Sequence, residues 1–424
     1  MNKPYDLIVF GATSFTGRLV ADYLSTTYGA GSGVGSGLGR ELGRGLGSTL
    51  RWAMAGRNLD KLAQVRSLIG APATLPLLQA DATDPAALAA LVGQTRAVIT
   101  TVGPYQRYGE ALVAACAAAG CDYVDLCGEP AWMAKMIPKL AAPALASGAR
   151  IVFSCGFDSI PFDLGVVYLQ AEAMARLGAP LVQVRGRVKT MRGGMSGGTL
   201  ASALATFEQM GRDPATAALM ADPFALTPGF RGPAQPDGDV AALDEPNHSW
   251  AGPFVMATIN TKNVHRTNAL RGHPWGTGFL YDEKLMTSRG AKGEWAARLL
   301  AGGARIQNAL LGFAPTRTLL GRFALPQPGD GPGPAARASG HYDLRFDGQT
   351  ADGRRLAVRV TGDRDPGYGS TSKMICEAAL CLLQDVDRSA TPGGVWTAGS
   401  AMGLALVRRL QAHAGLHFET IGAA

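Results

Sequence analysis

The residues that most clearly suggest a chemistry form a short turn near the amino terminus. An apolar run ends at Phe10, small and hydroxyl-bearing residues follow it, and a stretch of helical character starts after them. Small residues let the backbone approach a diphosphate, and the first N–H groups of a helix point at the anion. Because this turn lies between a strand and a helix, it predicts a dinucleotide site. Its residues are Gly11, Ala12, Thr13, Ser14, Phe15, Thr16 and Gly17.

Cationic residues follow the second β-rich run. Arg57 and Asn58 come directly after it, Lys61 lies one turn into the next helix, and no acid precedes Asp60. An NAD enzyme usually places Asp or Glu here for the ribose 2′-hydroxyl, whereas a cation pairs with the 2′-phosphate of NADP. The sequence therefore favours NADP(H). Asp81, after the third run, is interpreted either as an adenine-edge contact or as a helix-entry residue.

Three later turns are expected at the same edge of the sheet. Each contains glycine and also carries a polar or aromatic side chain, which a purely structural Gly-Pro turn does not need. Ligands of open α/β sheets bind outside the carboxyl ends of the strands. These turns add four predicted cofactor contacts, Val102, Gly103, Pro104 and Gly128.

The same turns supply three candidates for moving a proton. Tyr105 is the first candidate, because it lies beside the turn expected to border the nicotinamide. Asp158 is the second candidate and Cys127 the third. Asp158 and Ser159 are interpreted with equal weight as caps of the helix that follows them.

Strands and helices alternate over the first third of the chain. Several runs are apolar on both faces, as is typical of parallel strands covered by helices on either side. We therefore predict an α/β, Rossmann-type, doubly wound parallel sheet over residues 1–175. The expected strands are Asp6–Phe10, Arg51–Ala55, Leu75–Leu78, Ala97–Val102, Tyr123–Leu126 and Arg150–Cys155.

The rest of the chain predicts a second α+β domain over residues 176–370, with a mainly antiparallel sheet, and helices in residues 371–424. Alternating apolar residues carry this prediction. The expected strands are Leu181–Lys189, Phe254–His265, His341–Phe346 and Arg354–Thr361.

Glycine is unevenly distributed. It makes up 56 of the 424 residues, nearly twice the usual share of about 7%. Nearly every second residue of the segment 29–48 is glycine. Such a segment has no packed face to offset its backbone entropy, so it predicts an inserted surface loop. A lid over the cofactor is the alternative.

Composition limits the remaining function classes. The net charge of +7 suits an anionic ligand and is too small to indicate nucleic-acid binding. The six cysteines contain no C-x-x-C pair, which favours reduced thiols in the cytoplasm. We find no signal peptide, no charge-free window long enough to span a bilayer, and no metal motif, since His413 and His417 stand close to the chain end with Gly415 between them.

Residues 284–322 are strongly basic. They contain seven cations (Lys284, Arg289, Lys292, Arg298, Arg305, Arg317 and Arg322) and one acid, Glu294. Apolar residues recur there at near-helical spacing, at Trp295, Leu299, Ile306, Leu310 and Phe313. The commoner interpretation is a core-facing helix with a solvated charged side. The functional interpretation is a basic amphipathic helix that docks an acyl-carrier protein or a membrane surface.

Four segments together resemble the saccharopine dehydrogenase-like oxidoreductase family, in the branch that includes trans-acting enoyl reductases. They are GATSFTG, WAMAGRN, TTVGPYQRYGEALVAACAAAGCDYVDLCGE and GFDSIPFDLG. The resemblance implies an NADP(H)-binding Rossmann domain, an α+β substrate domain, and carboxyl-terminal helices that pack back on the first domain. Ser14 departs from the family, which commonly has glycine there, and the 29–48 insert is unusual.

Three functions follow from the residues and the resemblance. The leading one is an NADP(H)-dependent reductase, with a trans-acting enoyl reductase of hydrophobic acyl, lipid or polyketide-type substrates as one form. The second is a saccharopine-type amino-acid dehydrogenase, which needs cations to bind several carboxylates. The third is a non-catalytic nucleotide-binding or lipid-surface module. The sequence leaves open whether the protein forms a homodimer. Candidate carboxylate-binding cations are Arg185, Arg187, Lys189 and Arg192.

Overall fold

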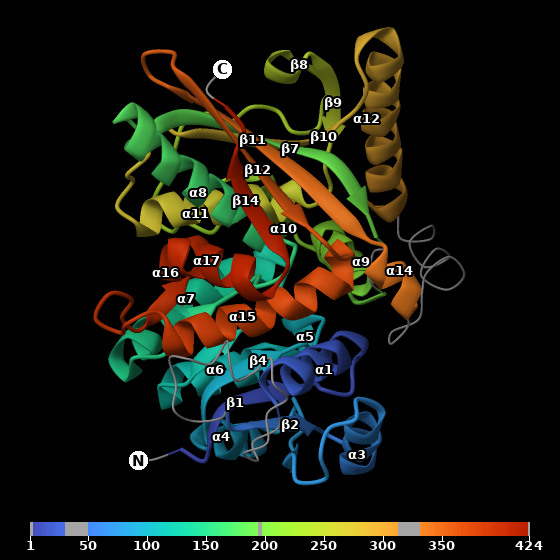
Figure 1. The fold of residues 1–424 in the computed structure, drawn as a ribbon, viewed down its shortest axis with the longest axis vertical. Helices are drawn as coiled ribbons and strands as arrows, with labels where there is room; N and C mark the ends of the chain where they lie inside the picture. Colours follow the sequence, from blue (N-terminus) through green and yellow to red (C-terminus); the bar gives the residue numbers. More distant parts are fainter. Residues whose placement is uncertain (1–2, 30–49, 194–196, 313–330, 423–424) are drawn as a thin grey trace.

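The computed structural model describes residues 3–29, 50–193, 197–312 and 331–422. Two seven-stranded sheets, each with its own helices, make up these parts of the chain (Figure 1). Sheet A is entirely parallel, and sheet B is mixed and mostly antiparallel. The predicted fold class is therefore confirmed. The 29–48 insert, apart from Gly29, lies outside the described residues.

Sheet A has the strand order β13-β6-β5-β4-β1-β2-β3. Six of its strands come from the first 152 residues, and the seventh comes from near the carboxyl terminus and pairs parallel with β6. The strands are β1 Tyr5–Phe10, β2 Trp52–Gly56, β3 Leu77–Gln79, β4 Thr95–Thr100, β5 Asp122–Val124, β6 Arg150–Val152 and β13 Gly394–Trp396.

Helices cover both faces of sheet A. Successive residues of its strands point to opposite faces, and the residues on both faces are apolar. On β1, Leu7 and Val9 belong to the core that contains α1 and α15, whereas Ile8 and Phe10 pack with α4, α6 and α7. The helices around this sheet are α1 Phe15–Tyr28, α3 Leu59–Leu68, α4 Pro85–Gly93, α5 Tyr105–Tyr108, α6 Glu110–Ala119, α7 Pro130–Ser147 and α15 Thr371–Gln384.

Sheet B has the order β14-β12-β11-β7-β10-β9-β8, and only β7 and β10 pair in parallel. β7, β11 and β12 correspond to three of the four predicted strands. The strands are β7 Leu181–Arg192, β8 Ala242–Asp244, β9 Ser249–Pro253, β10 Leu280–Met286, β11 His341–Thr350, β12 Arg355–Gly362 and β14 Leu416–Thr420.

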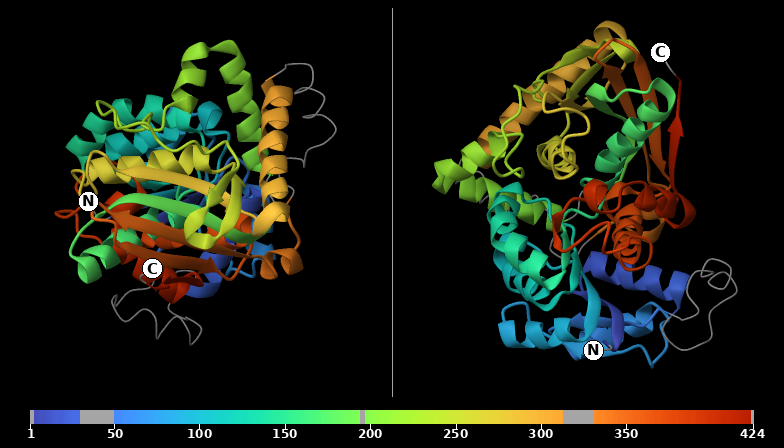
Figure 2. Two further views of the ribbon diagram at one scale, coloured as in Figure 1. Left: turned by 90° about the horizontal axis from the view of Figure 1, so that it is seen from above. Right: turned by 90° about the vertical axis from the view of Figure 1, so that its left-hand side faces the viewer.

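The helices of the second half lie around sheet B and between the two sheets (Figures 1 and 2). The longer ones are α8 Ile160–Leu177, α9 Gly197–Arg212, α10 Pro214–Ala221, α11 Ala257–Leu270, α12 Gly290–Gly312 and α17 Gly403–His413. The shorter ones are α14 Pro334–Ala338, α16 Ala398–Ala401, the 3-10 helix Glu245–Asn247 and the π-helix Pro366–Ser370.

The remaining predicted strand of the second half, Phe254–His265, is wrong. The strand β9 ends at Pro253, and residues 257–270 form helix α11. Most of its polar residues are buried, including Asn260, Lys262 and Arg266. A helix whose polar residues are mostly inside has no wide polar stripe toward solvent, so its apolar pattern does not show the helical period.

The carboxyl-terminal segment is more than a set of helices. It adds β13 to sheet A and β14 to sheet B, in addition to α15, which packs on α1, β4 and β5. The described part of this segment, residues 371–422, therefore joins both sheets. The domain boundaries after residues 175 and 370 stay predictions.

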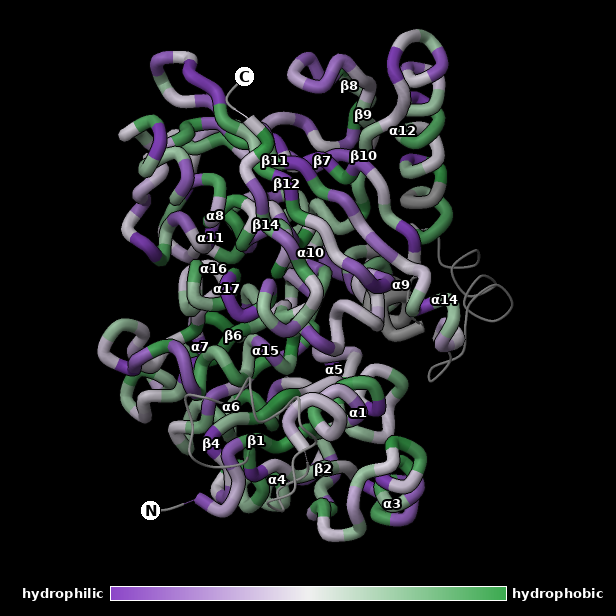
Figure 3. The backbone as a smooth tube through the Cα atoms, viewed as in Figure 1, coloured by the Kyte–Doolittle hydropathy of each residue, from purple (hydrophilic) through white to green (hydrophobic). Residues whose placement is uncertain are grey.

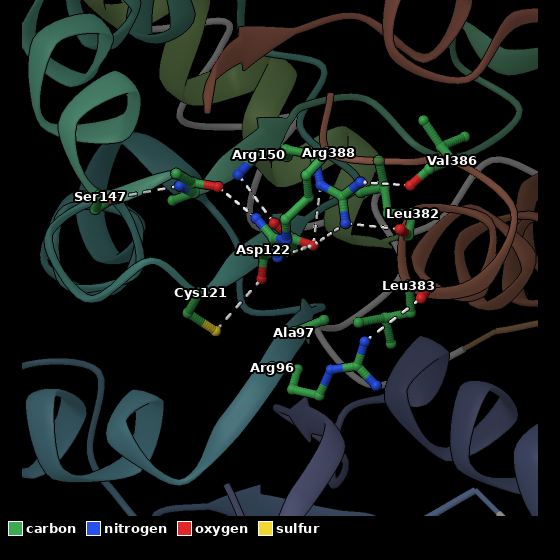
Figure 4. A network of polar contacts seen from close by, with 12 residues as sticks. Arg96, Ala97, Cys121, Asp122, Ser147, Arg150, Leu382, Leu383, Val386 and Arg388 are labelled. Carbon is green, nitrogen blue, oxygen red and sulfur yellow. Dashed lines mark hydrogen bonds and ion pairs between the residues drawn. The ribbon is translucent and has the colours of Figure 1, made fainter. Parts of the chain in front are cut away.

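A buried ion pair ties this segment to sheet A (Figure 4). The Arg150 guanidinium lies 2.5 Å from Asp122 Oδ2 and donates to the carbonyl oxygens of Leu382 and Val386 at 2.6 and 3.0 Å. Arg388 approaches the same carboxylate at 3.0 Å. Both members of the central pair are at most 2% exposed.

Replacing the acid of this pair should destabilise the protein strongly. Asp122→Ala leaves the Arg150 charge buried without its partner, and we expect the free energy of unfolding to fall by about 3–5 kcal/mol. Chemical denaturation measures this loss. Glu110→Ala removes a pair to Lys139 whose side chains are both 60% exposed, and it should cost at most about 1 kcal/mol. Equal losses for the two variants would contradict the prediction.

The basic segment 284–322 differs from its prediction. Lys284 belongs to β10, is buried, and donates to the carbonyl oxygens of Asp237 and Val240. The helix of this segment, α12, runs along the edge of the molecule, with apolar and polar residues mixed along it (Figures 1 and 3). One side of α12 packs on β9, as the core-facing interpretation expects, but Trp295, Leu299 and Ile306 are exposed and do not belong to that side. Phe313, Arg317 and Arg322 lie outside the described residues.

The α12 side that meets the sheet consists mostly of small residues, with Leu311 as a buried exception. In the described parts of the chain, no helix is long and apolar enough to cross a membrane.

Candidate active site

The glycine turn between β1 and α1 requires glycine at both ends. Gly11 has a φ of +85°, and a Cβ there would lie 2.5 Å from Cγ2 of Val102. A Cβ at Gly17 would lie 2.2 Å from the carbonyl oxygen of Gly11. Ala12 is buried, and Thr13 is half-buried. The turn is therefore held tightly against the segment that follows β4, as close approach to a diphosphate requires.

Ser14 caps helix α1, which explains how this chain tolerates serine at that position. Its Oγ accepts from the N–H of Gly17 at 2.9 Å and lies 2.9 Å from Oγ1 of Thr101. The N–H groups of Phe15 and Thr16 have no acceptor among the described residues. The capped helix thus still presents free amides, which are the donors that a bound diphosphate needs. The turn fits a dinucleotide.

The end of β2 presents cations to solvent. Arg57 and Lys61 are exposed, and neither forms an ion pair with a described residue. Asn58 caps α3, because its Oδ1 accepts from the N–H of Lys61 at 2.8 Å. Asn58 therefore has a structural role at this position, and Arg57 is left as the cation nearest to the strand end.

Asp81 forms a local turn before α4. Its carboxylate accepts from the N–H and the hydroxyl of Thr83 at 2.9 and 2.7 Å, and these hydrogen bonds lower the pKa of Asp81. The cap of α4 is Asp84. The adenine contact of Asp81 stays a prediction.

Tyr105 lies where expected, at the start of α5 after the Val102–Pro104 turn, and its hydroxyl is engaged. The hydroxyl donates to the carbonyl oxygen of Thr100 at 3.3 Å and accepts from the N–H of Leu126 at 3.0 Å. Burial raises the pKa of Tyr105 well above its ordinary value. This side chain links the carboxyl ends of β4 and β5.

Cys127 lies in a loop that a buried acid organises. Asp125 accepts from the N–H groups of Cys127 and Ser154 and from the Tyr123 hydroxyl, each at 2.9 Å. Burial raises the pKa of Asp125 to about 7. Burial also raises the pKa of the Cys127 thiol well above its ordinary value. Cys127 is fully buried, and it is part of the loop that Asp125 organises.

Glu129 joins this loop to the Tyr105 turn. Its two carboxylate oxygens accept from the N–H groups of Tyr105 and Gln106, both at 2.9 Å. Gly128 lies between it and Cys127. Sequence reasoning missed Asp125 and Glu129 as organising residues, although both acids stand at or just after the end of the predicted strand Tyr123–Leu126.

Asp158 differs from the other two candidates because its carboxylate has no partner among the described residues. It is half-buried in the loop after β6, directly before α8. Burial raises the pKa of Asp158 to about 6. Ser159 occupies the N-cap position of helix α8, but its side chain makes no capping hydrogen bond, and Asp158 does not occupy that position.

The residue after Asp158 is strained and is held by a buried network. Ser159 has a φ of +131°, a conformation that costs about 1–3 kcal/mol for a non-glycine residue. Its Oγ accepts from Asn263 at 2.7 Å and contacts Oδ1 of Asn260 at 3.2 Å. Asn260 donates onward to Glu283 at 2.9 Å. Residues from α11 and β10 thus fix the backbone that carries Asp158.

Comparison with known proteins identifies the family. A family model described as the saccharopine dehydrogenase NADP binding domain matches residues 26–152. Two trans-acting enoyl reductases are similar to this chain over nearly its whole length. The one from Mycobacterium leprae is 33% identical and the one from Mycobacterium tuberculosis is 34% identical, and each alignment covers 96% of this chain and 96% of the relative. The chain belongs to the saccharopine dehydrogenase-like oxidoreductase family. The first domain is accordingly of the family's NADP-binding type.

Two further relatives support the assignment. A second Mycobacterium tuberculosis protein, provisionally named a trans-acting enoyl reductase, is 37% identical over 99% of this chain and 98% of its own length. Saccharopine dehydrogenase (L-Glu forming) of Saccharomyces cerevisiae has a TM-score of 0.55 at 12% identity and covers 99% of this chain and 100% of its own. At that identity the yeast enzyme shares the fold with this oxidoreductase.

The cations considered for a saccharopine-type substrate are partly occupied. Arg187 is buried between Asp244 and Asp282, at 3.2 and 2.8 Å. Lys189 lies 3.4 Å from Asp343. Because these charges are already neutralised, they are poor ligands for the carboxylates of an amino-acid substrate.

Proposed function

We propose that this oxidoreductase is an NADPH-dependent reductase of α,β-unsaturated acyl thioesters that acts in trans on substrates made by another enzyme. The trans-acting enoyl reductases among its relatives support the reaction class. The observation that carries the proposal for this chain is the unpartnered Asp158 carboxyl group at the carboxyl edge of the dinucleotide-binding sheet. A hydrophobic acyl, lipid or polyketide-type substrate is part of the proposal.

The cofactor would be held by two parts of this chain. The free amides of Phe15 and Thr16 would bind the diphosphate, and Arg57 would pair with the 2′-phosphate. Bound NADPH supplies a hydride for the β carbon of the unsaturated acyl group. The remaining requirement is a proton at the α carbon, and a residue of the protein has to deliver it.

Asp158 is the residue best suited to give that proton. Its carboxyl group has a raised pKa and no competing hydrogen bond within the described residues, so its proton can go to the α carbon as the new C–H bond forms there. Tyr105 and Cys127 are positioning residues in this proposal. The first keeps the β4 and β5 ends together, and the second lines the loop between Asp125 and Glu129.

The test is NADPH oxidation in the presence of a long-chain 2-enoyl thioester. We expect absorbance at the reduced nicotinamide band to fall and the saturated thioester to appear in equal amount. The matched assay uses saccharopine with NADP⁺. We expect no turnover there, because two of the four candidate carboxylate-binding cations, Arg187 and Lys189, are already paired with acids. Turnover of saccharopine alone would overturn the proposal, and NADPH binding without turnover of either substrate would favour a non-catalytic nucleotide-binding module.

A further inference from the structure

Helix α12 packs against the protein mainly through small residues. Gly293, Ala297 and Ala301 are buried on the side that meets β9. At Gly252 on β9, an added Cβ would lie 3.1 Å from the carbonyl oxygen of Ala297. Two leucines share this side, because an added Cβ at Gly252 would also lie 3.1 Å from Cβ of Leu300 and Leu311 is buried.

Three large apolar residues of α12 form a stripe on the outward side. Trp295, Leu299 and Ile306 are 67%, 59% and 64% exposed. Their spacing of four and seven residues places them on one face, and the stripe is about 16 Å long at 1.5 Å per residue. We call these three residues the outer stripe. Scattered exposed apolar residues are normal, but an aligned set on one helix is typical of an interaction surface.

Positive charge flanks the outer stripe. Arg289, Lys292 and Arg305 are exposed and form no ion pair with any acid in the described part of the chain. The single acid of the helix, Glu294, is already paired with Arg298 at 2.5 Å. The surface around the stripe therefore carries uncompensated positive charge, and it is complementary to an anionic partner.

We propose that the outer stripe of α12 rests on an anionic lipid surface. Three side chains on one convex helix expose a few hundred Å² at most, well below the roughly 800 Å² per partner that a stable protein interface buries. A lipid surface requires no matching groove. It needs apolar side chains that enter the headgroup region and cations beside them that pair with lipid phosphates. The proposal is independent of the reductase function.

Vesicle co-flotation of the full chain tests this proposal. We expect binding to phosphatidylcholine vesicles that contain phosphatidylglycerol, little binding to pure phosphatidylcholine, and a loss of binding as salt rises. Trp295→Ser with Leu299→Ser should weaken binding about tenfold or more, and so should Lys292→Glu with Arg305→Glu. Leu68→Ser, at a leucine 71% exposed on α3, and Arg408→Glu on α17 are the matched controls and should bind as the unmodified chain does.

Three outcomes would overturn the lipid assignment. The first is equal recovery with charged and neutral vesicles at low salt. The second is vesicle binding that the stripe variants leave unchanged. The third is absent vesicle binding together with stripe-dependent binding of a purified acidic acyl-carrier protein or stripe-dependent self-association in sedimentation. Turnover of a water-soluble enoyl thioester, measured in parallel, should be unaffected by the stripe variants, so failure here is distinguishable from failure of the reductase proposal.

Discussion

Asp158→Asn should lower kcat for enoyl thioester reduction by about 10²–10⁴-fold while the Kd for NADPH stays nearly unchanged. The amide has the shape of the carboxyl group and cannot give up a proton to the α carbon. Since the carboxyl group has no structural partner among the described residues, the substitution should also leave the thermal unfolding midpoint nearly unchanged. Steady-state kinetics, NADPH titration and calorimetry measure the three quantities.

The pH profile gives this prediction a second readout. The reaction needs the protonated carboxyl group, whose pKa is raised to about 6 by burial. kcat/KM should therefore be constant below that pH and fall about tenfold per pH unit above it. The Asp158→Asn variant should lack this step. A profile of the unmodified enzyme that is flat between pH 5 and 8 would argue against Asp158 as the donor.

The other two candidates serve as matched controls. Tyr105→Phe removes a hydroxyl that bridges Thr100 and Leu126, and we expect a loss of stability of about 1–3 kcal/mol with less than tenfold change in kcat. Cys127→Ala should also retain most activity, because the thiol is fully buried. If Tyr105→Phe reduced kcat more than Asp158→Asn, the proton donor would be the tyrosine.

The fold of the first domain could be predicted from the sequence because its physical signal is local. On β1, Ile8 and Val9 are both apolar although they face opposite sides, and only a sheet covered on both faces needs that pattern. The strand β13 carries no such signal. It has three residues, too few for any period, and its place beside β6 depends on contacts with residues more than 200 positions earlier.

The errors in the second half have a different cause. Both α11 and α12 are helices whose apolar pattern misleads about where the core lies. In α11, Asn260 and Asn263 are inside because they hold Ser159 in a strained conformation. In α12, the buried side is mostly glycine and alanine, and the large residues Trp295, Leu299 and Ile306 face outward. Hydrophobic periodicity indicates that a helix is two-sided, and the packing of its neighbours decides which side is buried.

The organising acids could not be assigned from the sequence for a third reason. Asp125 binds the N–H group of Ser154, which is 29 positions away, and Glu129 binds N–H groups 23 and 24 positions earlier. Any residue can offer a backbone N–H group, so these partners leave no trace in residue types. The sequence could place both acids at strand ends, but only the coordinates show that they bind backbone instead of ligand.

Arg57→Asp should reverse the cofactor preference. The guanidinium follows β2 directly, is exposed and has no ion-pair partner in the described residues, so it is free to pair with a 2′-phosphate. Losing a charge-assisted bond of about 1.5–3 kcal/mol and adding a repulsive carboxylate should raise the Kd for NADPH by about 10²-fold or more. The Kd for NADH should change little or fall, since Asp can accept from the ribose 2′-hydroxyl.

Fluorescence titration with both reduced dinucleotides measures this reversal. Arg408→Asp, an exposed arginine on α17 without an ion-pair partner among the described residues, controls for the change in net charge and should leave both Kd values unchanged. Lys61→Asp distinguishes the two cations near β2: a larger effect there than at Arg57 would move the phosphate contact one turn into α3. Equal Kd values for NADPH and NADH in the unmodified protein would exclude a 2′-phosphate contact at either cation, because a cation that binds this phosphate must discriminate between the two.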